Sequence, residues 1–285
     1  MNATQIHAYL RASGTGSEHE RVGPFLATFT PGNDHPMRNY AIPDDDARPS
    51  SVEIDALVQA FEQRGLKPRL EYAANAAPRL EAILVAAGFE VEGLLPLMTC
   101  HPGEARPIEA PPDFVVALAE SDRDHAEAMV VAGDAYGEPG PPPGDAAVAA
   151  RQKMTAAGGA VVLARHRDSG EPAGSGLFPV PQAGVSELAA VGTRPAFRNR
   201  GVAAGVTARL VQAALDRGLE LLWLTPEDGR AERIYARAGF AFDAGQMVHI
   251  SKPRFDPANL RAGHPAVSRF GSTDRAGEAD GNKAG

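Results

Sequence analysis

The chain has 285 residues, of which 44% are hydrophobic, and its formal net charge at pH 7 is −8. This length suits one large domain or two of ordinary size, and the apolar share is sufficient for a buried core. The acidic charge argues against a protein that coats nucleic acid, and no apolar stretch reaches the roughly 20 residues needed to cross a bilayer.

The cysteine and histidine content argues against two kinds of site. The single cysteine, Cys100, rules out an intrachain disulfide, and we expect a buried thiol there. The eight histidines show no spacing typical of metal ligands, so we expect no metal. The first residues, MNATQIHAYLRASGTG, lack the basic and apolar stretches of a secretory signal, which favours a cytoplasmic protein.

Stretches rich in proline and glycine divide the chain into predicted domains. The stretch at 101–113 separates the strand-like EGLLPLMTC from the strand-like DFVVALAE, which is typical of a linker. The residues after Pro253 contain too few apolar side chains to offset their chain entropy, so we expect a disordered tail. The predicted organisation is an N-terminal domain at 1–105, a linker at 106–112, a second domain at 113–252 and a tail at 253–285.

Strand and helix patterns follow one another between 113 and 252 in an order typical of an α+β fold. Gly218 is expected to end a helix in a left-handed conformation, and Thr225 is expected to cap the start of the next helix. Strands are predicted at 114–119, 160–166, 173–180, 185–193, 220–225 and near 241–251, and helices at 122–135, 145–157, 201–217 and 226–238.

The two halves of the sequence contain a repeat. Residues 55–65, DALVQAFEQRG, align with residues 208–218, ARLVQAALDRG. Residues 70–89 then align without gaps to residues 221–240, with seven identities that include a final Ala-Gly-Phe. Matches in one order, with a small length change between the blocks, predict two related domains.

The alignment also indicates which copy keeps a functional loop. It places DDARPS, at 45–50, opposite RNRGVA, at 198–203. The exchange puts an anionic residue opposite Arg198 and a bulky residue opposite Gly201, and it replaces one backbone N–H donor by proline. Whatever anion the second copy holds, the first copy cannot hold it in the same way.

The segment RNRGVA lies between a predicted strand and a predicted helix, where N–H groups point outward and the helix dipole adds positive potential. Gly201 permits close approach of a ligand, and Arg198 and Arg200 can make charge-assisted bonds to phosphate oxygens. A pyrophosphate fits this description. The segment is not a Walker A loop, because no Gly-Lys-Ser/Thr follows, and it lacks the second glycine of a dinucleotide-binding fingerprint.

Read as Arg-x-x-Gly-x-Ala after the strand-like VSELAAVGT, this segment resembles the coenzyme A pyrophosphate motif of GNAT-type N-acetyltransferases. The later RIYARAGF, at 233–240, resembles a helix of the same family. The resemblance covers about 113–252, and the first 105 residues resemble the degenerate copy of tandem GNAT proteins. It implies two GNAT-like α+β domains, each with a mixed, mostly antiparallel sheet flanked by helices.

The resemblance implies acetyl-CoA as co-substrate and a small-molecule or peptide amine as acceptor, because the amine attacks the thioester directly in this family. The pantetheine arm would pair near Ala190, Val191 and Gly192, and the Val191 amide would polarise the thioester carbonyl. The pyrophosphate would be held by the loop residues Arg198, Asn199, Arg200, Gly201, Val202 and Ala203.

The same resemblance implies catalytic residues. Tyr235 falls where the family often has the acid that protonates the CoA thiolate, and the first copy has Leu84 there. Glu187 lies where some members have a general base. The alternative interpretation of Tyr235 is a core aromatic residue, and that of Glu187 is a carboxylate at the edge of a strand. The connection between the first two helices of the second domain is where this fold usually contacts the acceptor. The residues there that could bind the acceptor, or could simply form a loop, are Asp134, Tyr136 and Glu138.

A second functional class stays open beside the enzyme. A non-catalytic acyl-CoA-binding or sensing module would use the same loop, but it would have no need of a thiolate acid such as Tyr235. A longer acyl chain or a hydroxyl acceptor is a further alternative. The sequence is compatible with a monomer or a homodimer, because an internal pseudo-dimer reduces the need for a second chain.

Overall fold

The structure, a computed structural model, describes residues 2–13, 18–35 and 38–253. The tail predicted from residue 253 onward lies outside these residues, apart from Pro253 itself. The described residues show the mixture of helices and mostly antiparallel strands that the sequence predicts.

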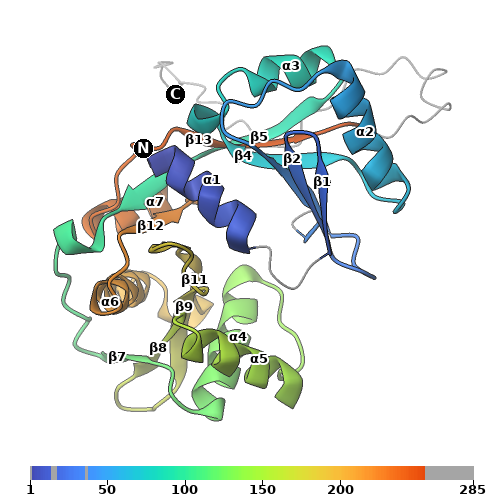
Figure 1. The fold of residues 1–285 in the computed structure, drawn as a ribbon. Coiled ribbons are helices and arrows are strands. Elements are labelled where there is room, and N and C mark those ends of the chain that lie inside the picture. The colour runs from blue at the N-terminus through green and yellow to red at the C-terminus, as the bar shows by residue number, and fades with distance from the viewer. Residues whose placement is uncertain (1, 14–17, 36–37, 254–285) are drawn as a thin grey trace, which may run out of the picture. The chain divides into compact units, whose positions relative to one another are not determined.

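The N-terminal half builds a six-stranded sheet with helices packed against it (Figure 1). The sheet order is β1-β2-β3-β4-β13-β5, in which β13 (Gln246–Ser251) comes from the end of the described chain, and among these described strands only β3 and β4 run parallel. Every residue of β4 is buried, as the core position of this strand requires. The elements are α1 (Asn2–Ser13), β1 (Glu18–Val22), β2 (Phe25–Phe29), β3 (Tyr40–Pro43), α2 (Ser51–Glu62), β4 (Arg69–Ala73), α3 (Leu80–Ala86), β5 (Glu90–Pro96) and β6 (Met98–Cys100).

The C-terminal half forms a four-stranded antiparallel sheet, β11-β9-β8-β7, and a three-stranded sheet, β10-β12-β6. The elements are β7 (Phe114–Leu118), α4 (Asp122–Tyr136), α5 (Asp145–Ala156), β8 (Ala160–His166), β9 (Pro172–Phe178), β10 (Val185–Glu187), β11 (Ala189–Thr193), α6 (Val202–Asp216), β12 (Leu221–Leu224), α7 (Gly229–Arg237) and β13 (Gln246–Ser251).

Two sequence predictions for this half need correction. The strand predicted at 185–193 is interrupted at Leu188, and its two parts pair with different strands. The helix predicted at 226–238, with Thr225 as its cap, starts at Gly229, because the Asp228 side chain accepts hydrogen bonds from the backbone N–H groups of the first turn. A carboxylate two or three residues before free N–H groups caps the helix there, so Thr225 is not needed as a cap.

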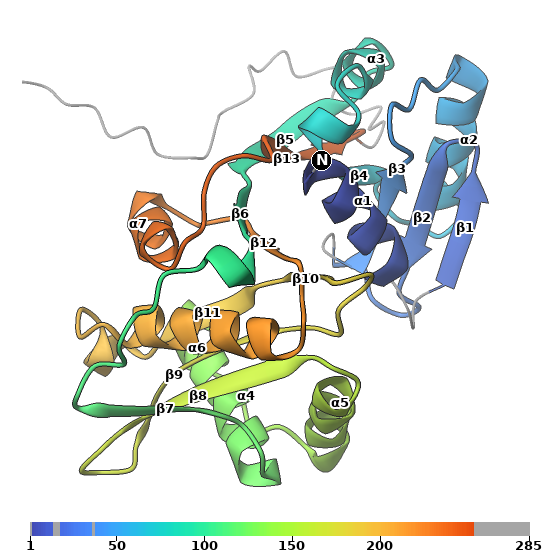
Figure 2. The same ribbon diagram turned by 60° about the vertical axis from the view of Figure 1, so that its left-hand side comes forward.

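The two halves exchange a strand. β13, the last described strand, lies between β4 and β5 in the N-terminal sheet, whereas β6 of the N-terminal half pairs antiparallel with β12 (Figures 1 and 2). Each half thus contributes one strand to a sheet of the other, and both strands lie after the last helix of their own half, β6 after α3 and β5, and β13 after α7. The six-stranded sheet and the three-stranded sheet therefore each contain one strand from the other half, whereas β11-β9-β8-β7 is built from the C-terminal half alone.

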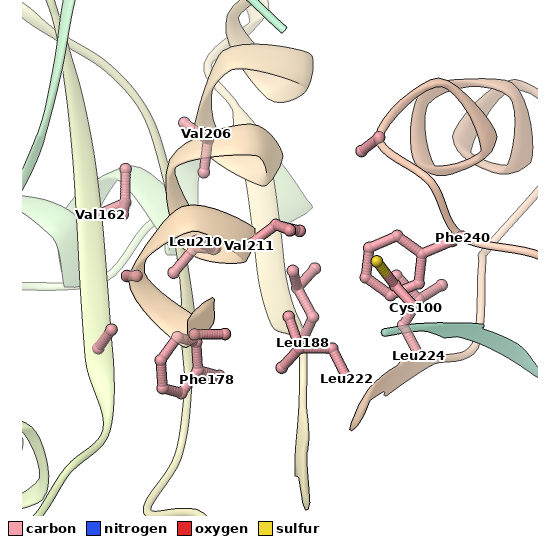
Figure 3. Packing of buried hydrophobic residues seen from close by; sticks show 14 of the residues in the cluster. Cys100, Val162, Phe178, Leu188, Val206, Leu210, Val211, Leu222, Leu224 and Phe240 are labelled. Atoms are coloured by element: carbon pink, nitrogen blue, oxygen red, sulfur yellow. The ribbon is translucent and has the colours of Figure 1, made fainter. Parts of the chain in front are cut away.

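Helix α6 covers one face of the C-terminal sheet, and α4 with α5 covers the other (Figure 2). Val206, Leu210 and Val211 of α6 are buried and point into a core that also contains Phe178 and Leu222 (Figure 3). Their helical spacing is the apolar stripe that predicted this helix. Cys100 is part of the same core and is a buried free thiol, as the sequence predicts.

The repeat has a structural counterpart. The order α2, β4, α3 in the first half corresponds to α6, β12, α7 in the second. The loops before the two long helices also share an unusual backbone, because Asp46 has a φ of 53° and Asn199 a φ of 63°. These residues stand opposite each other in the alignment, and few residues other than glycine adopt such a conformation. The domain boundaries at 105 and 113 stay predictions.

Candidate functional site

Strands β10 and β12 run parallel up to Glu187 and Trp223, and the chain then leaves this pairing. Beyond Leu188, β11 pairs only with β9 among the described strands. The register between β11 and β9 shifts between Ala189 and Gly192, which marks a β-bulge. Ala190, within the bulge, has a φ of 53°. The sheet therefore opens at the residues predicted to receive the pantetheine arm.

The end of helix α4 packs closely against the bulge. A Cβ atom at Gly192 would lie 2.6 Å from the Ala135 Cβ, so only glycine allows this approach. The contact lets the Tyr136 hydroxyl donate a hydrogen bond to the Val191 carbonyl, 3.3 Å away. Tyr136, predicted as an acceptor contact, is thus brought to the strand predicted to bind the thioester.

The loop that follows β11 leads into α6 without a side-chain cap. Gly201 is the N-cap residue, with a φ of 80°, and within the described residues no side chain bonds to the N–H groups of the first turn. A Cβ atom at this position would also lie 3.0 Å from the Pro111 Cγ. The structure therefore needs glycine here, and the helix presents unsatisfied N–H groups to a ligand.

A pocket of about 380 Å³ opens at this helix start. Four of its lining residues are arginines, and among the described residues that line it none is acidic. The Thr193 hydroxyl, also at the pocket, is buried and has no hydrogen-bond partner among the described residues. The lining residues are Thr193, Phe197, Arg198, Asn199, Gly201, Val202, Ala203, Ala204, Arg230, Arg233, Ile234 and Arg237. This donor set suits a multiply charged anion such as a pyrophosphate.

Three of the four pocket arginines come from α7 and were not among the predicted site residues. Arg230, Arg233 and Arg237 recur at spacings of three and four, which places them on one face of the helix. Arg230 also donates a hydrogen bond to the Asn199 side chain. The spacing was visible in the sequence, but the packing of α7 beside the start of α6 was not.

The predicted loop cations have different surroundings. Arg198 lines the pocket, and its guanidinium donates to the carbonyls of Thr193 and Ala135. Arg200 does not line the pocket, because its guanidinium pairs with Asp113 at 3.0 Å and lies over the Phe114 ring. The Arg200 side chain therefore does not take the place at the pocket that the sequence predicted for it.

The geometry agrees with what sequence comparison finds. The model of the Acetyltransferase (GNAT) family matches residues 126–240. This segment is a GNAT acetyltransferase domain. The chain thus carries an acyltransferase of a family that uses acetyl-CoA as co-substrate. No curated protein matches the sequence significantly.

Solved structures extend the likeness to both halves. A GCN5-related N-acetyltransferase from Kribbella flavida is similar over 90% of this chain and 98% of its own, with 26% identity and a TM-score of 0.73. One from Sphaerobacter thermophilus covers 90% and 94%, with 17% identity and a TM-score of 0.62. A tandem GNAT protein from the clavulanic acid biosynthesis pathway covers 90% and 89%, with 12% identity and a TM-score of 0.58. The fold is that of two GNAT-like domains.

Tyr235 of the GNAT domain lies on α7, half-buried against the core and edge-on to Phe240. Burial raises the pKa of its phenol above the usual value, and the nearby Tyr136 and Glu227 raise this pKa further. The phenol is therefore protonated at neutral pH. Glu227, which also raises the pKa of Tyr136, is a carboxylate near both hydroxyls that the sequence did not single out.

Glu187 of the GNAT domain faces a different set of groups. Burial raises the pKa of its carboxyl to about 8, and Glu71 of β4 adds repulsion. Two tyrosines of the N-terminal half, Tyr9 and Tyr40, have raised pKa values because of burial, and the charge of Glu187 contributes. The two predicted catalytic residues thus belong to separate clusters, and the Glu187 cluster includes residues from both halves.

The other two predicted acceptor contacts, Asp134 and Glu138, form no hydrogen bond to the described residues of the bulge. Asp134 accepts a hydrogen bond at 2.8 Å from Arg194, so its charge is already compensated. Glu138 is exposed and follows Gly137, which ends α4 in a left-handed conformation.

Among the described residues, no group of acidic, histidine and cysteine side chains could hold a metal ion. None of the helices in the described part has the length and apolar character needed to cross a membrane.

The start of α2, which corresponds to the start of α6, is closed by its own side chains. Ser50 accepts a hydrogen bond from the Glu53 backbone N–H, and the Glu53 carboxylate accepts from the Ser50 backbone N–H at 2.7 Å. Asp45, which stands opposite Arg198, lies 3.3 Å from Arg11. The Glu53 carboxylate therefore binds at the start of α2, whereas the corresponding start of α6 offers free N–H groups.

Proposed function

We propose that the C-terminal half transfers an acetyl group from acetyl-CoA to a primary amine by direct attack of the amine on the thioester. The observation that carries this proposal is the arginine-lined pocket at the uncapped start of α6. The unpartnered Thr193 hydroxyl adds a donor that a phosphate oxygen can satisfy. Arg198, Asn199 and the backbone from Arg200 to Ala203 would hold the pyrophosphate together with the arginines of α7.

The residues of the bulge would position the reacting carbonyl. The backbone near Ala190, Val191 and Gly192 would pair with the pantetheine arm, and the Val191 N–H would stabilise the developing oxyanion. A preorganised donor of this kind commonly contributes about 3 kcal/mol to the transition state. Tyr136 supports this geometry, because its hydrogen bond to Val191 ties α4 to the bulge.

Tyr235 would donate its proton to the departing thiolate, and Glu187 would accept the proton that the acceptor ammonium must lose. A protonated phenol is available at neutral pH because the pKa of Tyr235 is raised. A carboxyl with a pKa of about 8 is partly deprotonated near neutral pH and remains a stronger base than an exposed glutamate.

We further propose that residues 1–105 form a domain that has lost the CoA site, joined by 106–112 to the acetyltransferase domain at 113–252. The side-chain cap of Ser50 and Glu53 supports this, because it leaves no open helix start for an anion. The N-terminal domain keeps a structural role through the exchanged strands β6 and β13. The acetylated amine is a small molecule or a peptide, and the chain acts as a monomer or homodimer.

Titration of the purified protein with acetyl-CoA in a calorimeter tests the proposed site. We expect binding with one molecule of acetyl-CoA per chain, and weaker binding of ATP, which lacks the pantetheine arm. A stoichiometry of two would show that the N-terminal domain also binds. No binding at all would contradict the assignment of the pocket and with it the enzymatic function.

The pH dependence of turnover tests Glu187 as the base. Because the carboxyl has a pKa raised to about 8 and a base must be deprotonated, kcat/KM is expected to rise with pH and to level off above that value. Glu187→Gln is expected to lower kcat/KM about 100-fold at the plateau and to remove this limb of the profile. An unchanged profile in a folded Glu187→Gln variant would assign the limb to the acceptor amine instead.

A non-catalytic acyl-CoA-binding module is the alternative function. It would use the same pocket and give the same titration. Release of free thiol from acetyl-CoA in the presence of an amine panel separates the two, since a binding module releases none.

A further inference from the structure

Beside the bulge lies a narrow pocket under α4. It is lined by apolar atoms of α4, β8, β9 and β11, by Ser175, and by one charged side chain, Arg151 of α5. Its volume is about 30 Å³. Because a water molecule needs about 10–15 Å³ of such space, the pocket has room for about two oxygen-sized groups. Ala190, the left-handed residue of the bulge, forms part of its wall.

Arg151 has a charge that the described residues do not compensate. It is half-buried, and it forms no hydrogen bond or ion pair with any residue that the structure describes. Burial lowers the pKa of its guanidinium, as expected where water is scarce. A partly buried cation is costly unless an anion accompanies it.

Among the described residues, none of the titratable groups around Arg151 forms an ion pair with it. His125 of α4 is buried, and burial together with the charge of Arg151 lowers the pKa of its imidazole, so His125 is neutral. Asp122 accepts a hydrogen bond from Gln152. Asp124 accepts a hydrogen bond from Arg165 at 2.7 Å and also caps α4. The guanidinium thus remains available to a ligand.

We infer that Arg151 binds a carboxylate of the acceptor, so that the acetylated substrate is an amine that carries a carboxylate close to its amino group, as an amino acid does. This inference rests on the proposed acetyl transfer. Guanidinium and carboxylate match as a planar pair with two parallel hydrogen bonds, and the pocket admits two oxygen atoms. Because Ala190 belongs both to the pocket wall and to the bulge at which the thioester carbonyl would lie, only a few bonds separate the carboxylate from the attacking nitrogen.

Acetylation of amino acids and of the amines that lack only their carboxylate tests this inference. The pairs are phenylalanine with 2-phenylethylamine, lysine with cadaverine, and histidine with histamine. We expect the amino acid of at least one pair to have the higher kcat/KM by about 10- to 100-fold, the usual range for a charge-assisted contact. Equal or higher values for the decarboxylated amines in all pairs would overturn the inference but leave acetyl transfer in place.

The variant Arg151→Met removes the charge and keeps the apolar stem. It is expected to lower kcat/KM for the preferred amino acid by the same 10- to 100-fold, mainly through KM, and to leave its decarboxylated partner unchanged. Lys153→Met, on the exposed side of the same helix, is the matched control and should change neither value. Arg151→Lys should recover part of the loss, because it restores the charge without the planar fork.

The outcomes separate the two proposals. A uniform loss for amino acids and amines in Arg151→Met would indicate a structural role and overturn the inference, and thermal unfolding would report the loss of stability directly. Turnover of none of the six amines by a protein that still binds acetyl-CoA would overturn the inference, whereas absence of acetyl-CoA binding would contradict the proposed function itself.

Discussion

Reversal of two charges on α7, in the variant Arg230→Glu/Arg233→Glu, is expected to weaken acetyl-CoA binding more than about 100-fold without unfolding the protein. Both side chains line the pocket at the start of α6, and no described acidic residue lines it. A charge-assisted hydrogen bond contributes about 1.5–3 kcal/mol, and two anions in place of two cations add repulsion to the loss of both. Calorimetric titration measures the dissociation constant.

The N-terminal half offers a matched control for this prediction. Arg79 is aligned with Arg230 and is exposed; it lies directly before α3, and Arg230 lies in the first turn of α7. The positions aligned with Arg233 and Arg237 are Ala82 and Ala86, so the first half lacks the cationic face. Arg79→Glu should therefore leave acetyl-CoA affinity unchanged. Equal loss in both variants, or no loss in the double variant, would contradict the assignment of the pocket.

The sequence predicted the elements of the C-terminal half well because their signals are local. Alternating or continuous apolar residues identify strands such as β8, and the stripe of Val206, Leu210 and Val211 identifies α6. Gly218 ends that helix with a φ of 72°, as predicted. These features depend on residues within a few positions of one another, so one sequence is enough to find them.

The partner of a strand is not a local property. The apolar pattern of β13 predicts a strand, but the same pattern fits the sheet of either half. The exchange of β6 and β13 is set by packing between the halves, through β4 and β5 on one side and β12 on the other. A division of the chain into consecutive domains therefore describes the repeat in the sequence better than it describes the sheets.

Side-chain direction explains the incomplete prediction of the pocket. The sequence shows Arg198 and Arg200 two residues apart in one loop, but not that Arg200 turns toward Asp113 and Phe114. It also shows the arginines of α7 without their proximity to α6, which depends on how α7 packs after β12. The fold supplies the neighbours that turn a charge pattern into a site.

If Glu187 is the base, as proposed, its location gives the N-terminal half a part in the chemistry. The raised pKa of this carboxyl comes from burial and from Glu71, which belongs to the other half. Strand exchange fixes β4 and β13 in one sheet, and Glu71 of β4 pairs in register with His249 of β13. In the proposed mechanism, the N-terminal half therefore influences the protonation of the base without binding CoA itself.

Removal of the Tyr235 hydroxyl, in Tyr235→Phe, is expected to lower kcat about 100-fold while acetyl-CoA affinity stays nearly unchanged. The ring would keep its contact with Phe240 and the core, so only the proton donor is lost. Tyr136→Phe is the control, because it removes a hydroxyl from the same cluster that bonds to the Val191 carbonyl and has no proposed acid role. Its effect on kcat should be clearly smaller. Thiol release under saturating acetyl-CoA measures both.

The pH profile of the wild-type protein gives the acid role a second test. A general acid must be protonated, so activity is lost as pH rises through its pKa. An ordinary tyrosine would produce that loss near pH 10. Because burial, Tyr136 and Glu227 raise the pKa of Tyr235, no decline is expected up to about pH 10.5 if the protein stays folded. Equal kcat for Tyr235→Phe and wild type would remove the acid role and leave Tyr235 as a packing residue of α7.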